Sequence, residues 1–243
     1  MILEPRWPAP RHIKACITLR TGGVSPAPYA QFNLGDHVGD KPEHVIANRE
    51  ILKNKLALPH EPIWIQQTHS IIAVEATPEN TRKEADASYT SQPNQTCVIL
   101  TADCLPILVC NKNGTHIAAI HAGWRGLANG VIEATLAKLN VPPEDLLVWL
   151  GPAISAKHYE VGHEVRDQFL SIQPNATHAF TPSPNQRWLA DLYELARLRL
   201  KNIGVTTTYG GEYCTYSDKN LFYSYRRDGK ETGRMASLIW IPH

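Results

Sequence analysis

Length, composition and charge describe a globular chain and exclude several functional classes. The 243 residues are enough for a sizeable buried core, and 24 basic residues against 23 acidic ones give a formal net charge of +1. This balance offers no bulk attraction to nucleic acids or anionic membranes. No apolar run approaches the roughly 20 residues of a membrane-spanning helix, and the N-terminal residues lack the pattern of a secretory signal.

The cysteines indicate a reducing compartment. They number five, are widely scattered and form no CxxC pair. In a chain of this length, such a pattern is typical of reduced intracellular thiols rather than of a disulfide framework. We therefore expect a soluble cytoplasmic protein.

Strand and helix patterns alternate along the first half of the chain. Residues 13–19 are predicted to form a strand that ends before the turn-forming pair Gly22-Gly23. Asp40 and Pro42 introduce a helical pattern that continues to Leu56. Five short apolar runs follow, and their continuous apolar character predicts strands covered on both faces. These runs span residues 62–65, 71–74, 97–100, 105–110 and 117–120.

The second half adds helices and a final strand. One helix is predicted over residues 124–139, before Pro142-Pro143. Another begins near Asp191, where Asp191 and Glu194 resemble a capping box, and ends at Gly204. Residues 173–186 are predicted to form a loop, and residues 236–241 the last strand. The chain shows no repeat and no clear linker, so we expect a single domain over residues 1–243.

Three short motifs in the middle of the chain carry residues of the metal-ligating type. They are Gln67-Thr68-His69-Ser70, Thr101-Ala102-Asp103-Cys104-Leu105-Pro106 and His121-Ala122-Gly123-Trp124-Arg125-Gly126. Three His and Cys ligands leave a fourth tetrahedral position free, as in a catalytic zinc site. His69, Cys104 and His121 are therefore expected to meet within a few ångströms. The spacing matches no zinc-finger rule, so ordinary histidines and a buried cysteine remain the alternative.

The three motifs belong to a wider set that strongly resembles the laccase-domain family of bacterial cytoplasmic proteins, the YfiH type. The other matching stretches are residues 21–25, 33–35, 85–87, 151–154, 159–161, 222–228 and 232–234. The resemblance implies an α+β fold, a mixed β-sandwich core flanked by helices and related to cysteine-deamidase toxins. It also implies that His69, Cys104 and His121 are both the zinc ligands and the catalytic residues.

The resemblance further implies an activity. Members of this family are expected to cleave purine nucleosides (adenosine, inosine, guanosine and methylthioadenosine) with phosphate, giving the free base and ribose 1-phosphate, and to deaminate adenosine in the same site. The implied cofactor is zinc, with copper as an alternative because Cu(II) outranks zinc at most N/S sites. The expected partners are a purine nucleoside and phosphate, with no nucleic acid, membrane or obligate protein partner.

Other functions would use the same residues. Cys104 beside His121 or His69 would form the thiolate–imidazole pair of a cysteine hydrolase or amidase, for example one that edits cell-wall precursors. The family was first named for copper-dependent polyphenol oxidation, but the 11 histidines include no HxH pair, which multicopper centres use repeatedly. A non-catalytic binding module is the remaining alternative.

The predicted substrate-binding residues are polar or basic side chains within or beside the matching motifs. They are Arg20, Asn33, Asp103, Arg125 and Arg226. Arginine suits phosphate because its planar fork binds oxyanions bidentately. Arg125 is preferred, since it follows His121 near a predicted helix N-terminus. Asp103 is expected to orient a zinc-bound histidine or to accept a substrate hydroxyl, and Asn33 offers an amide to the ribose or the purine.

Overall fold

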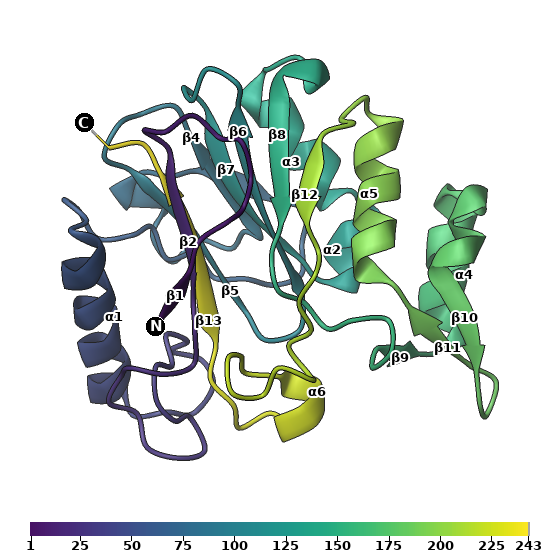
Figure 1. Ribbon diagram of the computed structural model, residues 1–243, viewed down its shortest axis with the longest axis horizontal. Coiled ribbons are helices and arrows are strands. Elements are labelled where there is room, and N and C mark those ends of the chain that lie inside the picture. Colours follow the sequence, from purple (N-terminus) through teal and green to yellow (C-terminus); the bar gives the residue numbers. More distant parts are fainter. Residues whose placement is uncertain (243) are drawn as a thin grey trace.

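The computed structural model describes residues 1–242 and shows two β-sheets packed face to face between layers of helices (Figure 1). One sheet is antiparallel, with the order β1 (Ile2–Leu3), β2 (Lys14–Thr18), β13 (Met235–Trp240) and β5 (Thr96–Thr101). The other is mixed, with the order β12 (Thr208–Gly210), β8 (Leu146–Leu150), β6 (Leu105–Asn111), β7 (Ile117–Ala122), β4 (Ala87–Thr90) and β3 (Ala73–Glu75).

The alternation of side chains along the central strands builds two cores at once. In β6, Ile107 and Val109 belong to the core beneath the helices, whereas Leu108 and Cys110 belong to the core between the sheets. Successive side chains of a strand point to opposite faces of the sheet. When both faces are covered, every position is buried, and apolar and polar residues do not alternate. This explains why the strands β5, β6 and β7 are continuously buried.

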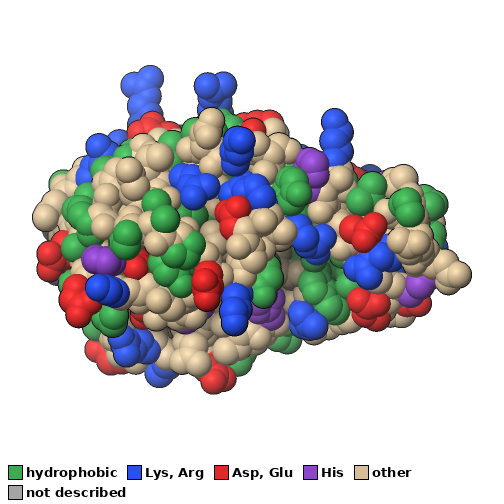
Figure 2. Space-filling view, turned by 90° about the horizontal axis from the view of Figure 1, so that it is seen from below, with side chains coloured by type: hydrophobic (Ala, Val, Ile, Leu, Met, Phe, Trp, Pro, Cys, Tyr) green, Lys and Arg blue, Asp and Glu red, His purple; other side chains and the backbone are tan. Residues whose placement is uncertain are grey.

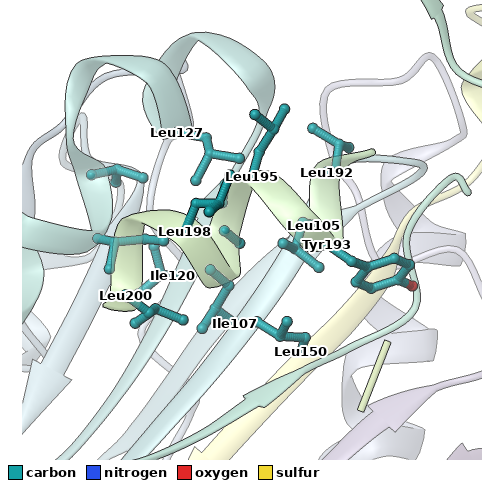
Figure 3. Packing of buried hydrophobic residues seen from close by; sticks show 14 of the residues in the cluster. Leu105, Ile107, Ile120, Leu127, Leu150, Leu192, Tyr193, Leu195, Leu198 and Leu200 are labelled. Carbon is teal, nitrogen blue, oxygen red and sulfur yellow. The ribbon is translucent and has the colours of Figure 1, made fainter. Parts of the chain in front are cut away.

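Helices cover both outer faces of the sandwich. Helix α1 (Pro42–Leu56) places Leu52 against the four-stranded sheet. Helices α2 (Trp124–Asn129), α3 (Val131–Leu139) and α5 (Leu192–Asn202) cover the six-stranded sheet. Figure 3 shows the leucines of α5 lying over Ile107 and Ile120 of that sheet.

Smaller elements lie beside and below the sandwich (Figure 1). A three-stranded antiparallel sheet of β9 (Glu160–Val161), β10 (Phe180–Ser183) and β11 (Arg187–Ala190) projects to one side together with helix α4 (His163–Ile172). Short helix α6 (Tyr225–Asp228) lies at the lower end of the molecule. The 3₁₀ segments are η1 (Pro78–Asn80), η2 (Pro143–Asp145) and η3 (Pro174–Ala179). Within residues 1–242, no helix combines the length and the apolar character needed to cross a membrane.

The predicted β-sandwich flanked by helices is confirmed, as are the strands from residue 97 to 120, the first and last long strands and helix α1. The Asp191 cap is also confirmed, because its carboxylate accepts from the backbone N–H of Glu194 at 3.1 Å. Helix α4 and strands β4 and β8 were not predicted; α4 and β4 are partly polar, whereas β8 is apolar and fully buried.

Four predicted elements were wrong in extent. Residues 62–65 make only an isolated bridge at Ile63, because the backbone turns where the Trp64 N–H donates to the Pro62 carbonyl. The run 71–74 becomes strand only at Ala73, since its two isoleucines are exposed. The predicted helix 124–139 is split by Gly130, whose φ of +101° ends α2 and starts α3. The predicted loop 173–186 contains η3 and β10.

Candidate active site

The three predicted ligand residues converge at one place, as expected. The ligating atoms of His69, Cys104 and His121 all lie within 4.8 Å of one another. His69 comes from the segment before β3, Cys104 from the turn between β5 and β6, and His121 from β7. The Cys104 Sγ to His69 Nε2 distance is 3.8 Å, close to the separation of about 3.6 Å that sulfur and nitrogen ligands have around a tetrahedral zinc ion.

The backbone at two of these turns adopts an uncommon conformation. His69 has a φ of +61° and Asp103, next to Cys104, a φ of +89°. Such values cost free energy for residues other than glycine and persist only where neighbours hold them. One such neighbour is Gln67, whose side-chain amide pairs with the Leu100 backbone through bonds of 2.6 and 2.8 Å. The segment before His69 is thereby fastened to the end of β5.

A buried carboxylate organises the two histidines of this set. Asp86, which is fully buried, accepts from the His121 Nδ1 at 2.7 Å. It also accepts from the backbone N–H groups of Thr68, His69 and Ser70. The bond at Nδ1 leaves the Nε2 of His121 available for a metal, which is the arrangement that outer carboxylates impose on ligating histidines.

No role was predicted for Asp86. The available signal was its context, Ala85-Asp86-Ala87, in which both alanines prove to be buried. An acid between buried residues requires partners, because an unpaired carboxylate is not stable in a protein interior. The partners themselves lie more than 15 residues away and could not be read from the sequence.

Charges within the site alter the pKa of the thiol and of one imidazole. Burial alone would raise the pKa of Cys104, but His121 and His69 outweigh it and lower that pKa to about 6. Burial would lower the pKa of His121, but Cys104 and Asp86 raise it to about 9. Without a metal, the pair is therefore a thiolate beside an imidazolium at neutral pH. With a metal, the thiolate is the form that ligates.

The backbone between His121 and α2 approaches the site closely. A Cβ atom at Gly123 would lie 2.6 Å from the His69 Cδ2 and 3.2 Å from the Cys104 Sγ. The φ of Gly123 is −66°, which any residue adopts. Glycine is therefore required here for space rather than for backbone conformation.

Replacing Gly123 by alanine should displace two ligands without straining the backbone. We expect the affinity for zinc to fall about tenfold or more, as it does when residues that hold a metal ligand in place are changed. The measurement is zinc content after dialysis against graded concentrations of a competing chelator. Gly162→Ala is the control, since its φ of −82° suits alanine and a Cβ there meets only the flexible end of the exposed Glu164 side chain. Equal zinc affinity of Gly123→Ala and the wild type would contradict this account.

These residues lie in a cavity of about 490 Å³. Its wall is partly apolar, with Leu100, Ala102 and Ile154, and partly aromatic, with Tyr159 and Tyr225. Burial, followed by the nearby Cys104 charge, raises the pKa of the Tyr159 phenol, so that it stays neutral. A mainly apolar wall with a few polar groups is the usual character of a small-molecule site.

Three arginines supply positive charge to the same cavity: Arg125, Arg226 and Arg234. The Arg125 guanidinium lies over the Trp124 ring at 4.4 Å. Arg226 donates to the Glu160 carbonyl at 3.0 Å, and Arg234 to the Thr232 carbonyl at 2.9 Å. Each of these two bonds uses one terminal nitrogen of the guanidinium. Figure 2, which views the end that carries α6, shows Lys and Arg side chains gathered over the middle of this face.

Arg125 and Arg226 were predicted to bind substrate, whereas the sequence analysis assigned no role to Arg234. It belongs to the matching stretch Thr232-Gly233-Arg234, which was the only available signal. The structure brings it to the cavity because it immediately precedes β13, while Arg226 lies in α6. Burial lowers the pKa of Arg234, and the nearby Cys104 and Asp103 charges oppose this shift.

The other two predicted ligands of substrate do not face this cavity. The Arg20 guanidinium donates to the backbone carbonyls of Ala30 at 3.3 Å and Lys219 at 2.9 Å, and it borders a separate, shallow surface depression. Asn33 is fully buried, and its amide bonds to Gly35 and Asp40. Both side chains therefore bond to the chain itself outside this cavity, and their assignment as substrate-binding residues stays a prediction.

Asp103 lines the cavity but does not have the first of its two expected roles, which was to orient a histidine. The expected contact with a substrate hydroxyl stays a prediction. Its carboxylate makes no bond to a histidine, and Asp86 orients His121 instead. Both oxygens of Asp103 accept hydrogen bonds from the protein, one from the Thr215 hydroxyl and one from the Arg226 N–H, each at 2.6 Å.

Comparison with known proteins decides the family. A family model described as multi-copper polyphenol oxidoreductase laccase matches residues 14–242. The chain belongs to this family. It is 52% identical over 240 residues to a purine nucleoside phosphorylase of Pseudomonas aeruginosa, covering 98% of each chain. It is 48% identical over 241 residues to the purine nucleoside phosphorylase YfiH of Escherichia coli, covering 99% of this chain and 98% of that one.

Solved structures agree with this family membership. A Neisseria meningitidis protein of family DUF152 superimposes with a TM-score of 0.96 at 49% identity, covering 100% of this chain and 99% of that one. YlmD from Geobacillus stearothermophilus superimposes with a TM-score of 0.90 at 30% identity, covering 96% of this chain and 93% of that one. The predicted YfiH-type fold is therefore confirmed.

The names of the relatives and of the family point to different chemistry. The relatives at 48–52% identity are named as purine nucleoside phosphorylases, whereas the family model is named after copper oxidases. Within residues 1–242, a group of three or more potential metal ligands occurs once, and it consists of His69, Cys104 and His121. Multicopper oxidation needs several such sets, so the described residues fit a single-metal site.

Proposed function

We propose that this protein is a purine nucleoside phosphorylase that acts on adenosine, inosine, guanosine and methylthioadenosine. The observation that carries the proposal is the composition of one cavity, in which a His-Cys-His set and three arginines line the same space. The names of the close relatives support the same reaction class. Adenosine deamination, in which water replaces the amino group at C6, is proposed as a second activity of this cavity.

The metal proposed for the site is zinc. One thiolate and two imidazoles are ligands that zinc accepts, and Asp86 holds the tautomer that leaves the His121 Nε2 unprotonated. When bound by His69, Cys104 and His121, zinc supplies Lewis-acid chemistry at its fourth coordination position. Copper would find the same donors, but the described residues provide no second set for oxidase chemistry.

The arginines are proposed to bind phosphate. In phosphorolysis a phosphate oxygen forms a bond to the ribose C1′, the C1′–N9 bond breaks, and the purine leaves with its bonding electrons and takes up a proton. Guanidinium groups hold the phosphate oxygens and neutralise their charge. Within residues 1–242, Asp103 is the only carboxylate that lines the cavity, and its oxygens already accept from Thr215 and Arg226. The three guanidinium groups therefore outnumber the Asp103 carboxylate and the Cys104 thiolate in the lining of the cavity.

Phosphate dependence tests this proposal. We expect release of free purine from inosine and adenosine to require phosphate, to saturate with it and to give ribose 1-phosphate, as measured by chromatography of the products. In Arg125→Ala the KM for phosphate should rise about 10- to 100-fold, the equivalent of a lost charged hydrogen bond of about 1.5–3 kcal/mol. The KM for nucleoside should change less.

Arg20→Ala is the matched control, because Arg20 binds backbone carbonyls outside the cavity. Its KM for phosphate should equal that of the wild type. Base release that proceeds equally well without phosphate would overturn the phosphorylase assignment. An unchanged KM for phosphate in Arg125→Ala would overturn only the role of that residue.

The cysteine hydrolase stays a second candidate, because the thiolate–imidazolium pair formed by Cys104 and His121 is what such an enzyme needs. Metal removal separates the two mechanisms. The zinc mechanism requires that activity disappears with the metal and returns with added zinc. Activity that persists after complete removal of zinc and is abolished by a thiol alkylating agent would favour the hydrolase.

A further inference from the structure

Asp103 joins three segments that lie far apart in the sequence. Its backbone carbonyl accepts from the Ile154 N–H at 3.0 Å. Its carboxylate accepts from the Thr215 hydroxyl and from the backbone N–H of Arg226, both at 2.6 Å. The residue is 7% exposed. The turn next to Cys104 is thus tied to the segment after β8, to the segment after β12 and to α6.

The bond to Arg226 connects the part of the cavity lined by the His-Cys-His set with the part lined by arginine. Asp103 is bonded covalently to Cys104, and its carboxylate holds the first turn of α6, from which the Arg226 side chain extends. Farther along that side chain, the guanidinium lies over the Tyr159 ring at 5.3 Å and donates to the Glu160 carbonyl. Arg226 is therefore fixed at its backbone by Asp103 and at its tip by the segment at β9.

We infer that Asp103 is a positioning residue that fixes where the Arg226 guanidinium lies relative to the Cys104 thiol. An anion bound by Arg226 is thereby placed relative to the His-Cys-His set. Small displacements of positioning groups are costly, since an error of about 1 Å reduces a rate by about 10²-fold. This inference rests on the proposed phosphorylase function, because it takes the anion to be the phosphate substrate.

The chemistry of the two bonds allows a selective test. Asparagine at position 103 can still accept from the Arg226 N–H with its Oδ1, and it can donate from Nδ2 to the Thr215 hydroxyl, which is also an acceptor. Asp103→Asn therefore keeps both links and removes only the charge. Asp103→Ala loses both links. Thr215→Val removes the donor to one oxygen and leaves the bond to Arg226 in place.

The experiment compares steady-state phosphorolysis of inosine in the three variants and the wild type. In Asp103→Ala we expect the KM for inorganic phosphate to rise about tenfold or more, with a smaller change in the KM for inosine. In Asp103→Asn both constants should stay within about twofold of the wild type, because the links remain. Thr215→Val should fall between them, and Thr135→Val, at a buried threonine of α3, serves as its control.

Hydrogen exchange of the Arg226 amide gives a readout that does not depend on activity. The amide should lose protection in Asp103→Ala and keep it in Asp103→Asn. The inference is overturned if Asp103→Asn is as impaired as Asp103→Ala, since Asp103 would then act through its charge. It is also overturned if both KM values rise equally in Asp103→Ala. Phosphate-independent cleavage by the wild type would overturn the proposed function instead, and the exchange result would still decide whether Asp103 holds Arg226.

Discussion

Cys104→Ala should reduce turnover of purine nucleosides by about 10³-fold or more while leaving the protein folded, because the loss removes a group that acts directly at the reacting centre. The thiol is only partly buried, at the edge of the cavity, so its loss should not prevent folding. Zinc content should fall at the same time. The measurements are rate, bound zinc and thermal unfolding on one preparation.

Two other cysteines provide matched controls for this substitution. Cys97 and Cys110 are fully buried, and burial raises the pKa of each thiol to about 12, which makes them unreactive. Alanine at either position should lower the free energy of unfolding by about 1 kcal/mol, as small losses of core volume do. The rate should stay close to that of the wild type. If Cys104→Ala turned over inosine as fast as these controls, neither the zinc mechanism nor the thiolate mechanism could stand.

The strands that position the site could be predicted because each is buried on both faces. Strands β5, β6 and β7 form continuous apolar runs, and no other local pattern competes with them. Residues 62–65 are also apolar, but the backbone turns between Pro62 and Trp64 and makes only an isolated bridge at Ile63. Side chains can be buried without their backbone joining a hydrogen-bonded ladder. Apolar content thus predicts burial more directly than it predicts strand pairing.

The convergence of the three candidate ligand residues was predictable, but the residues that support them were not. His69, Cys104 and His121 belong to unusual local motifs, whereas the residues that hold them depend on tertiary contacts. Arg20 and Arg125 were both predicted to bind substrate, as basic residues within or beside the matching motifs. Only the fold shows that the guanidinium of Arg20 binds backbone carbonyls while that of Arg125 lines the cavity. Residue type indicates what a side chain can bind, and contacts determine whether it is available to do so.

Asp86→Ala should impair both stability and metal binding. It removes the acceptor for the His121 Nδ1 and for the backbone N–H groups of Thr68, His69 and Ser70. Loss of one partner from a buried charged network costs about 3–5 kcal/mol, and loss of an outer carboxylate lowers metal affinity about 10- to 100-fold. Chemical denaturation and competitive zinc titration measure the two effects separately.

Asp86→Asn separates the chemical role of this carboxylate from its structural role. An asparagine has the same shape but only one acceptor oxygen. If its Oδ1 accepts from the backbone N–H groups of Thr68 and Ser70, its Nδ2 faces the His121 Nδ1 and requires that nitrogen to accept. The proton of the imidazole would then sit on Nε2, the nitrogen needed for zinc. We therefore expect Asp86→Asn to retain more stability than Asp86→Ala and yet to bind zinc and turn over inosine poorly. Asp191→Asn, at the cap of α5, is the control, because asparagine caps helices about as well as aspartate. Normal zinc affinity in Asp86→Asn would show that the negative charge of Asp86 is not needed to set the tautomer of His121.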